Sequence, residues 1–440
     1  MQIDLPWGHE TLHLNVPDTW ALVFPQNKPM MNAILSDETA IVRAALESPV
    51  DSQRLRDVDL GEKHILIVVD DNTRPTPVSR FLHLILEELR SAGTDSSRIT
   101  LMPALGIHSP MSPAEMSAKV GAENLAKLHW RNHNAFNEAE MKHFGTTRRG
   151  TPVILNRAVA DADWIILVGL IEPHLWAGFG GGLKNIFPGL ASAAAIGAHH
   201  EIIAEPPYRF NRVGMEPEDN SFRQDLEEIA GFIPARIYCV NVALDHQGSI
   251  SAAFAGDPVA AHRQGVRFNK QTAGRYLQKA VDAVIVNSYP MDINFKQSMK
   301  GVANSLPALT AGGTVMAFLR AERGLDDITP PADAKPLWLV KGILRLLGAP
   351  RIMWFLEKIR PGLNVEEKFL LYYSLQLVRQ YELYFHVPTL TEKTVRQLGF
   401  FKNFSEPQAV IDHAAKKLKR NAAVAVFTEA GATFPVIETV

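Results

Sequence analysis

The sequence predicts an α/β protein with two α/β domains, each built on a mostly parallel sheet. Short apolar runs rich in β-branched residues recur without strict alternation, which is typical of parallel strands buried on both faces. Helical patterns lie between these runs, and this alternation favours an open sheet covered by helices. A chain of 440 residues is long enough for two such domains.

Four strands and three helices are expected in the first part of the chain. One helix should begin after Ser112, because Glu115 follows three residues later and completes a capping box. The other two helices are expected at residues 79–92 and 222–232. The strands are expected at residues 64–70, 99–105, 164–171 and 237–244.

A second α/β unit follows, and we place the domain boundary near residue 270. This gives an N-terminal domain of residues 1–270 and a C-terminal domain of residues 271–440, whose last segment could pack back on the first domain. Beyond a polar loop at 324–335 the patterns are mainly helical, apart from an apolar run at 422–427. The elements around and after the boundary are a helix at 257–273, a strand at 282–288, a helix at 294–309 and a strand at 313–319.

Composition excludes several classes of protein. A net charge of -2 gives no basic footprint, so no nucleic-acid partner is expected. The single cysteine, Cys239, cannot form an internal disulfide or a cysteine-rich metal site. The N-terminus lacks the pattern of a secretion signal, and charged residues interrupt the most apolar stretch, 337–359. We therefore expect a cytoplasmic protein without a membrane partner.

Polar clusters follow directly on four of the predicted strands. Ligands of open α/β sheets bind beyond the carboxyl ends of the strands, so these clusters predict one active site, in a cleft between the two domains. The clusters are Asp70-Asp-Asn-Thr-Arg74, Gly106-Ile-His108, Glu172-Pro-His174 and Met291-Asp-Ile-Asn294.

A glycine-rich turn follows His174 and includes Gly180, Gly181 and Gly182. Such a turn can bring backbone N–H groups close to a phosphate. A P-loop is excluded because Leu183 separates the last glycine from Lys184, and the spacing of a dinucleotide fingerprint is also absent. A plain structural turn is the alternative.

Two further pairs of residues have both functional and structural interpretations. His199 and His200 are adjacent, and histidine is both an acid–base near neutral pH and a frequent metal ligand, although a single histidine is more often structural. Gln297 and Lys300 are three residues apart and share one helix face. They could hold a carboxylate, or they could belong to a solvated face.

Taken together, these clusters resemble the lactate racemase family. The resemblance covers about residues 65–320, and its most specific part is the block from His174 to His200. The matching pieces arrive in the family's order: Asp71-x-Thr-Arg74, Gly106-x-His108, His174, Ala177-Gly-Phe-x-Gly-Gly-x-Lys184, Pro188-Gly189, His200 and Asp292-x-Asn294-x-x-Gln297-x-x-Lys300.

The resemblance implies a nickel-pincer nucleotide, attached covalently through Lys184 and held in the N-terminal domain. His200 would be the protein ligand to nickel, with His199 as its neighbouring rival, and His108 and His174 would be the paired acid–base residues. Asp71 would help to order the first loop or contact the cofactor, and the turn of Gly180, Gly181 and Gly182 would meet the nucleotide phosphate. The substrate-binding residues would be Arg74, Gln297 and Lys300, two of them from the C-terminal domain.

The reaction implied by the resemblance is racemisation or epimerisation of a 2-hydroxy acid, lactate-like or larger, by hydride transfer to the cofactor. Lys296, where the family leads us to expect tyrosine, leaves the substrate open. The enzymes that make the cofactor would be transient partners. Two alternatives stay open: a nicotinamide-dependent 2-hydroxy acid dehydrogenase that uses His108 or His174 as its base, and a non-catalytic nucleotide-binding protein.

Overall fold

The computed structural model describes residues 1–27, 37–201, 213–245, 247–326, 337–348 and 375–438, with positions 330, 351, 352, 354 and 358. It divides into two compact units. We call Met30–Asn211 with Met215–Gln271 the inner unit. We call Met1–Pro29, Arg212–Gly214 and Thr272–Val440 the outer unit.

The inner unit is built on a six-stranded sheet in the order β13-β12-β9-β4-β5-β6. Neighbouring strands are parallel except for β13, which pairs antiparallel with β12. The four predicted strands are all present, and the α/β class is confirmed. The strands are β4 Ile65–Asp70, β5 Ile99–Ala104, β6 His129–Trp130, β9 Trp164–Leu170, β12 Arg236–Leu244 and β13 Ile250–Gly256.

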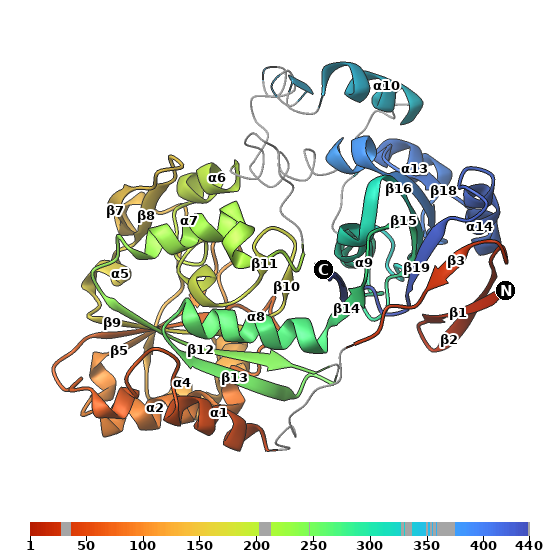
Figure 1. Cartoon of the computed structure of the whole chain (residues 1–440). Coiled ribbons are helices and arrows are strands. Elements are labelled where there is room, and N and C mark those ends of the chain that lie inside the picture. The colour runs from red at the N-terminus through yellow and green to blue at the C-terminus, as the bar shows by residue number, and fades with distance from the viewer. Residues whose placement is uncertain are drawn as a thin grey trace. The chain divides into compact units, whose positions relative to one another are not determined.

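Helices cover both faces of this sheet, with α1 and α2 on one face and α7 and α8 on the other (Figure 1). Apolar side chains of α1, α2 and α3 pack against β4, β5, β9 and β12 to form one core. The predicted capping box begins α3, where Ser112 Oγ accepts from the Glu115 N–H at 3.3 Å. The helices are α1 Glu38–Glu47, α2 Leu82–Ser91, α3 Pro113–Val120, α4 Ala122–Leu125, α5 Arg157–Asp161, α6 Ala193–Glu201, α7 Ser221–Ala230 and α8 Ala260–Thr272.

Two small hairpins of the inner unit were not expected from the sequence. Strands β7 and β8 form one of them, and β10 and β11 form the other, directly after β9. The second hairpin carries His174 and leads into a single 3₁₀ turn, Gly182–Asn185, that carries Lys184. The strands are β7 Met141–Thr146, β8 Pro152–Asn156, β10 Pro173–His174 and β11 Gly178–Phe179.

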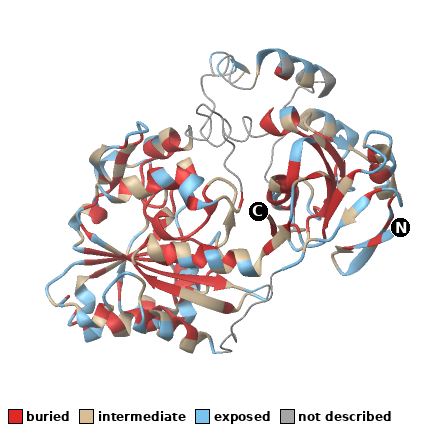
Figure 2. Ribbon diagram, viewed as in Figure 1, coloured by how far each residue is buried: buried red, intermediate tan, exposed pale blue. Residues whose placement is uncertain are grey.

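The outer unit has a second six-stranded sheet, in the order β18-β17-β16-β15-β19-β3, and every neighbouring pair is parallel. Buried residues line the longer strands of this sheet and of the sheet in the inner unit, whereas the short edge strands β3, β18 and β6 have none (Figure 2). The strands are β3 Ala21–Val23, β15 Val281–Asn287, β16 Leu309–Phe318, β17 Glu382–His386, β18 Lys402–Asn403 and β19 Ala423–Phe427.

The beginning of the chain belongs to the outer unit, which differs from the predicted N-terminal domain of residues 1–270. The reason is strand pairing: Ala21 in β3 lies opposite Ala423 in β19. Hairpin β1–β2 precedes β3 and packs in the same core. The strands of this hairpin are β1 Gln2–Trp7 and β2 Glu10–Asn15.

The prediction of mainly helical structure beyond residue 335 is wrong for β17, β18 and β20, which are strands. Strand β20, Phe434–Ile437, pairs with β14, Gly274–Leu277. Much of 327–374 lies outside the described residues. The helices described in this unit are α9 Phe295–Ser305, α10 Leu337–Leu347, α13 Glu392–Leu398 and α14 Pro407–Ala415. In the described part of the chain, none of the helices is long and apolar enough to cross a membrane.

Candidate active site of the inner unit

A carboxylate–imidazole pair lies where β4 and β5 end. His108 Nδ1 is 2.6 Å from Asp71 Oδ2, and the other Asp71 oxygen accepts hydrogen bonds from Thr73 N and Oγ1 at 3.1 and 2.5 Å. Burial raises the pKa of Asp71, but the hydrogen bonds from His108 and Thr73 outweigh it and hold the pKa below its ordinary value. An ionised carboxylate only accepts, so His108 Nδ1 carries the proton and Nε2 keeps its lone pair.

Lys119 of α3 supports the loop that carries this pair. Its Nζ lies 2.7 Å from Asp70 Oδ1 and donates to the carbonyl oxygens of Asp71 and Arg74, both at 2.9 Å. Thr76 Oγ1 donates to the other Asp70 oxygen. Burial raises the pKa of Asp70 to about 6, although the neighbouring Lys119 opposes this change. Lys119 was not predicted from the sequence, where no motif marks it, and it stands between apolar Met116 and Val120 on the buried face of α3.

Arg74 lies on the same loop and pairs with Glu172, which follows β9. Arg74 Nη1 and Glu172 Oε1 are 3.0 Å apart, and both side chains are about one-third exposed, at 34% and 28%. A guanidinium in this position can bind a carboxylate through two parallel hydrogen bonds. The structure therefore joins the first and third predicted clusters through an ion pair that the sequence did not predict.

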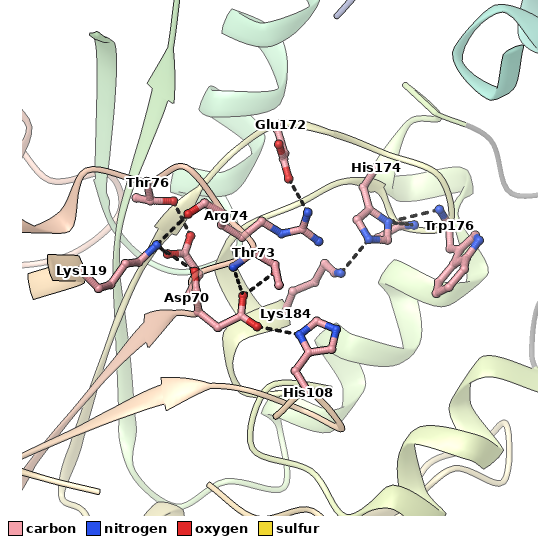
Figure 3. A network of polar contacts seen from close by, with 12 residues as sticks. Asp70, Thr73, Arg74, Thr76, His108, Lys119, Glu172, His174, Trp176 and Lys184 are labelled. Atoms are coloured by element: carbon pink, nitrogen blue, oxygen red, sulfur yellow. Dashed lines mark hydrogen bonds and ion pairs between the residues drawn. The ribbon is translucent and has the colours of Figure 1, made fainter. Parts of the chain in front are cut away.

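His174 is fixed by the backbone of its own hairpin. Its Nδ1 accepts from the N–H groups of Trp176 and Ala177, both at 3.2 Å, and its Nε2 lies 3.0 Å from Lys184 Nζ (Figure 3). Burial lowers the pKa of His174 well below its ordinary value, and the charges of Lys184 and Arg74 add to this effect. The imidazole is therefore neutral.

Lys184 is half-buried. The two charged side chains with the largest effect on its pKa are both cations, Arg74 and Arg223. Burial lowers its pKa well below the ordinary value for lysine, and Arg74 and Arg223 lower it further, while Glu172 and Asp71 oppose the change. In Figure 3 the side chains of His174 and Lys184 point toward one another.

The glycine-rich turn is held in place by buried side chains of three other elements. Gly181 has a φ of +73°, and a Cβ at this position would lie 2.8 Å from Leu170 O, so the turn requires glycine there. Gly182 donates to Asn241 Oδ1 at 3.0 Å, and the carbonyl of Gly180 accepts from His262 Nε2 at 3.0 Å.

Arg223 of α7 completes this support, donating to Phe179 O at 2.5 Å and to Gly181 O at 3.4 Å. Burial lowers the pKa of Arg223 to about 9. The N–H groups of Gly180 and Gly182 are both bonded within the protein, the first to Glu172 O at 2.7 Å. These two groups therefore do not support the prediction that the turn binds a phosphate, which stays a prediction.

The two adjacent histidines of α6 lie in different surroundings. His199 is fully buried, with its ring 4.0 Å from that of Phe222 and 5.0 Å from that of Phe187. His200 is half-buried, its ring 5.2 Å from that of Trp176. His200 Nδ1 donates to Ile196 O at 2.7 Å, which leaves the lone pair on Nε2.

His200 has the protonation state that a metal ligand needs. Burial lowers the pKa of His200 to about 4, so its ring is neutral near pH 7. No group of three His, Cys, Asp or Glu side chains within the described residues could by itself hold a metal ion. His200 can therefore offer a single imidazole lone pair to a metal ion.

The remaining predicted residues lie in the outer unit. Gln297 is half-buried and Lys300 is exposed, both in α9. Asn294 caps this helix by accepting from the Gln297 N–H at 2.9 Å. The shared helix face is as expected, and the role of these two residues in substrate binding stays a prediction.

Known proteins with similar sequences point to one family. Residues 7–210 match the lactate racemase N-terminal domain. A lactate racemase of Thermoanaerobacterium thermosaccharolyticum is 33% identical over 319 residues, which are 71% of this chain and 73% of that protein. A lactate racemase of Lactiplantibacillus plantarum is 31% identical over 330 residues, which are 73% of this chain and 75% of that protein.

Solved structures agree with the sequence comparisons. The lactate racemase apoprotein from Thermoanaerobacterium thermosaccharolyticum aligns with a TM-score of 0.81 and 25% identity, over 99% of this chain and 100% of that one. A Thermotoga maritima protein aligns with a TM-score of 0.62 and 18% identity, over 93% of this chain and 100% of that one, and shares the fold. The α/β fold and the named relatives define an enzyme of the isomerase class. The chain belongs to the lactate racemase family.

Proposed function

We propose that this protein racemises or epimerises a 2-hydroxy acid, lactate or a larger relative, in the cytoplasm with a nickel-pincer nucleotide. The observation that carries the proposal is the arrangement of His108, which follows β5 and pairs with Asp71 after β4, and of His174 and Lys184, which both follow β9 and contact one another. The enzymes that make the cofactor would meet the protein transiently, when the cofactor is loaded.

Lys184 and His200 are the residues that would hold the cofactor. The Lys184 amine would form the covalent link, and His200 Nε2 would bind nickel through the lone pair left by its bond to Ile196 O. When bound, the cofactor supplies an acceptor for the hydride from C2 of the substrate. Asp71 and the glycine-rich turn position the groups around it.

His108 is the residue best prepared to act as a base. Its Nδ1–H is bonded to Asp71 at 2.6 Å, so Nε2 is free to take the proton of the substrate hydroxyl, and Asp71 stabilises the imidazolium that results. Inversion of C2 would need a second residue to handle the hydroxyl proton on the opposite side of the substrate. His174 Nε2 would face the substrate oxygen on that second side.

Substrate binding falls to cations that can hold a carboxylate while C2 is inverted. Arg74 is one-third exposed, and its Nη1 lies 3.0 Å from the Glu172 carboxylate. A substrate carboxylate would bind the Arg74 guanidinium beside Glu172 or in its place. Gln297 and Lys300 of α9 are the further substrate-binding residues that we propose.

Two measurements on protein produced together with the cofactor pathway test this function. Nickel should be present in stoichiometric amount by elemental analysis, and the Lys184 peptide should carry a mass adduct. The His200→Ala variant should lose nickel, whereas His83→Ala, a matched change at an exposed position of α2, should keep it. A protein without nickel or adduct, obtained with a working pathway, would contradict the proposal.

A panel of 2-hydroxy acids assayed by chiral chromatography then identifies the substrate. Deuterium at C2 should be retained in the product, because a hydrogen that moves as a hydride is not released to water. Washout to solvent would indicate proton abstraction instead. Net oxidation with bound nicotinamide would indicate a dehydrogenase.

A further inference from the structure

Two lysines that flank the same loop have opposite surroundings. Lys119 Nζ has three oxygen neighbours: it forms an ion pair with Asp70 Oδ1 at 2.7 Å and donates to the carbonyls of Asp71 and Arg74 at 2.9 Å. An ammonium group has three hydrogens to donate, so these contacts suit a charged lysine. Among the described residues, no carboxylate oxygen lies within 4.0 Å of Lys184 Nζ, the distance limit for an ion pair. The polar partner of Lys184 Nζ is His174 Nε2, at 3.0 Å.

The hydrogen bonds of His174 decide which atom donates in this contact. Two backbone N–H groups, of Trp176 and Ala177, point at His174 Nδ1, so this nitrogen cannot carry a proton. A neutral imidazole has one N–H, which must therefore be on Nε2. That N–H needs an acceptor, and Lys184 Nζ can accept only if it has a lone pair.

We infer that His174 has a second role before any substrate binds: its Nε2–H donates to Lys184 Nζ and holds this lysine as a free, nucleophilic amine ready for acylation. The inference rests on the proposed function for the identity of the acyl donor, a pyridine thiocarboxylic acid. The reactivity of the amine itself depends only on the contacts of this chain.

The charged groups around Lys184 favour the same state. Arg74 from the loop after β4 and Arg223 from α7 disfavour a third cation, whereas Glu172 after β9 and Asp71 after β4 favour it. Glu172 is already paired with Arg74 at 3.0 Å, and Asp71 with His108 at 2.6 Å. Burial, the largest effect, lowers the pKa of Lys184 in the same direction as the two arginines.

The acylation step is a condensation without oxidation or reduction. The Nζ lone pair, released from its hydrogen bond with His174 Nε2–H, attacks the acyl carbon, an N–C bond forms, and the bond from that carbon to its leaving oxygen breaks. One amine proton leaves with that oxygen, so that a thiocarboxylic acid gives a thioamide and water. An ammonium group has no lone pair for this attack, which is why the protonation state of Lys184 sets the rate.

The test uses the apo-protein, produced without the cofactor pathway, and the N-hydroxysuccinimide ester of acetic acid as probe. Acetylation of individual lysines is measured by peptide mass spectrometry between pH 6.5 and 9. The rate at an exposed lysine such as Lys127 should rise about tenfold per pH unit, because only the free amine reacts. The rate at Lys184 should change less than about threefold over the same range.

The slope with pH, unlike the rate itself, does not depend on how accessible each lysine is. Lys119 serves as a buried internal control and should stay unmodified. A Lys184 rate that rises with pH as steeply as that of Lys127 overturns the inference. Absence of nickel or of racemase activity in loaded protein would contradict the proposed function and leave this slope unchanged, so the two failures are distinguishable.

Variants of His174 separate its role from general packing. His174→Phe keeps a ring without a donor and should make the Lys184 rate rise with pH more steeply than in the wild type but less steeply than at Lys127, because burial and the two arginines still act on Lys184. His174→Gln offers an amide N–H and should keep the flat profile. Because either change could disturb the hairpin, nitrogen-15 NMR of the wild-type imidazole gives an independent reading. It should show His174 protonated at Nε2 alone, and a proton on Nδ1 would refute the inference.

Discussion

Replacing Asp71 by asparagine should remove the base function of His108 while leaving the loop intact. The amide oxygen of the new side chain can still accept from Thr73 N and Oγ1, which now lie at 3.1 and 2.5 Å from Asp71 Oδ1. The amide NH₂ then faces His108 Nδ1, where the carboxylate oxygen was, 2.6 Å away. Since an NH₂ group donates, His108 Nδ1 must accept and its proton must move to Nε2.

The size of the effect follows from what is lost. A positioned general base contributes about 10²- to 10⁴-fold to a rate, so kcat should fall by that factor with little change in KM. The charge-assisted bond from His108 to a nearly buried carboxylate, 4% exposed, contributes about 1.5–3 kcal/mol, and the new amide bond recovers part of it. Stability should therefore fall by less than about 2 kcal/mol.

The assay is racemisation by chiral chromatography, with rates divided by the nickel content of each preparation. Asp95→Asn is the matched control, because Asp95 accepts from Ser97 N and Oγ in the same local motif, at 2.9 and 2.6 Å, without a histidine partner. Nitrogen-15 NMR should show the His108 proton on Nδ1 in the wild type and on Nε2 in the variant. A kcat for Asp71→Asn within threefold of the control would refute the reasoning.

Two further predictions concern stability. Gly181→Ala should destabilise the protein by about 1–3 kcal/mol in urea denaturation, because its φ is +73° and a Cβ would meet Leu170 O at 2.8 Å. Gly180→Ala, whose Cβ would have no neighbour closer than 3.4 Å, is its control, and equal losses would contradict this account. Burial raises the folded-state pKa of Asp70 to about 6, so its contribution to stability is complete below about pH 4 and is lost as the pH rises through 6. The wild type should therefore lose up to about 3 kcal/mol relative to Asp70→Asn between pH 4 and 7, and parallel pH profiles would refute the assignment.

The sheet of the inner unit was predictable because its strands are continuous apolar runs. Strand β4 is buried at every position, so its sequence is a continuous apolar run and does not alternate between apolar and polar residues. Such a run can be recognised in the sequence. Hairpin β10–β11 was not predictable, since each of its strands has only two residues. The pairing of β3 with β19 was also out of reach, because local patterns carry no information on partners about four hundred residues apart.

The candidate site could be predicted as a set of residues but not as a set of protonation states. His108 and His174 follow strand ends, which is visible in the sequence. Their tautomers depend on Asp71 in one case and on the backbone N–H groups of Trp176 and Ala177 in the other, which only the folded hairpin brings into place. The different surroundings of His199 and His200 were not predictable either, since small apolar residues precede both in α6, and only the structure shows His199 fully buried and His200 half-buried.

The inner unit is an insertion within the chain of the outer unit, and this order has a consequence during synthesis. Strand β3 is made near the start, but its partner β19 begins at Ala423, about four hundred residues later. At about 5–20 residues per second, a ribosome needs roughly 20–80 seconds to cover that distance. During this interval the inner unit can complete its own sheet, whereas β3 stays unpaired until β19 has been synthesised.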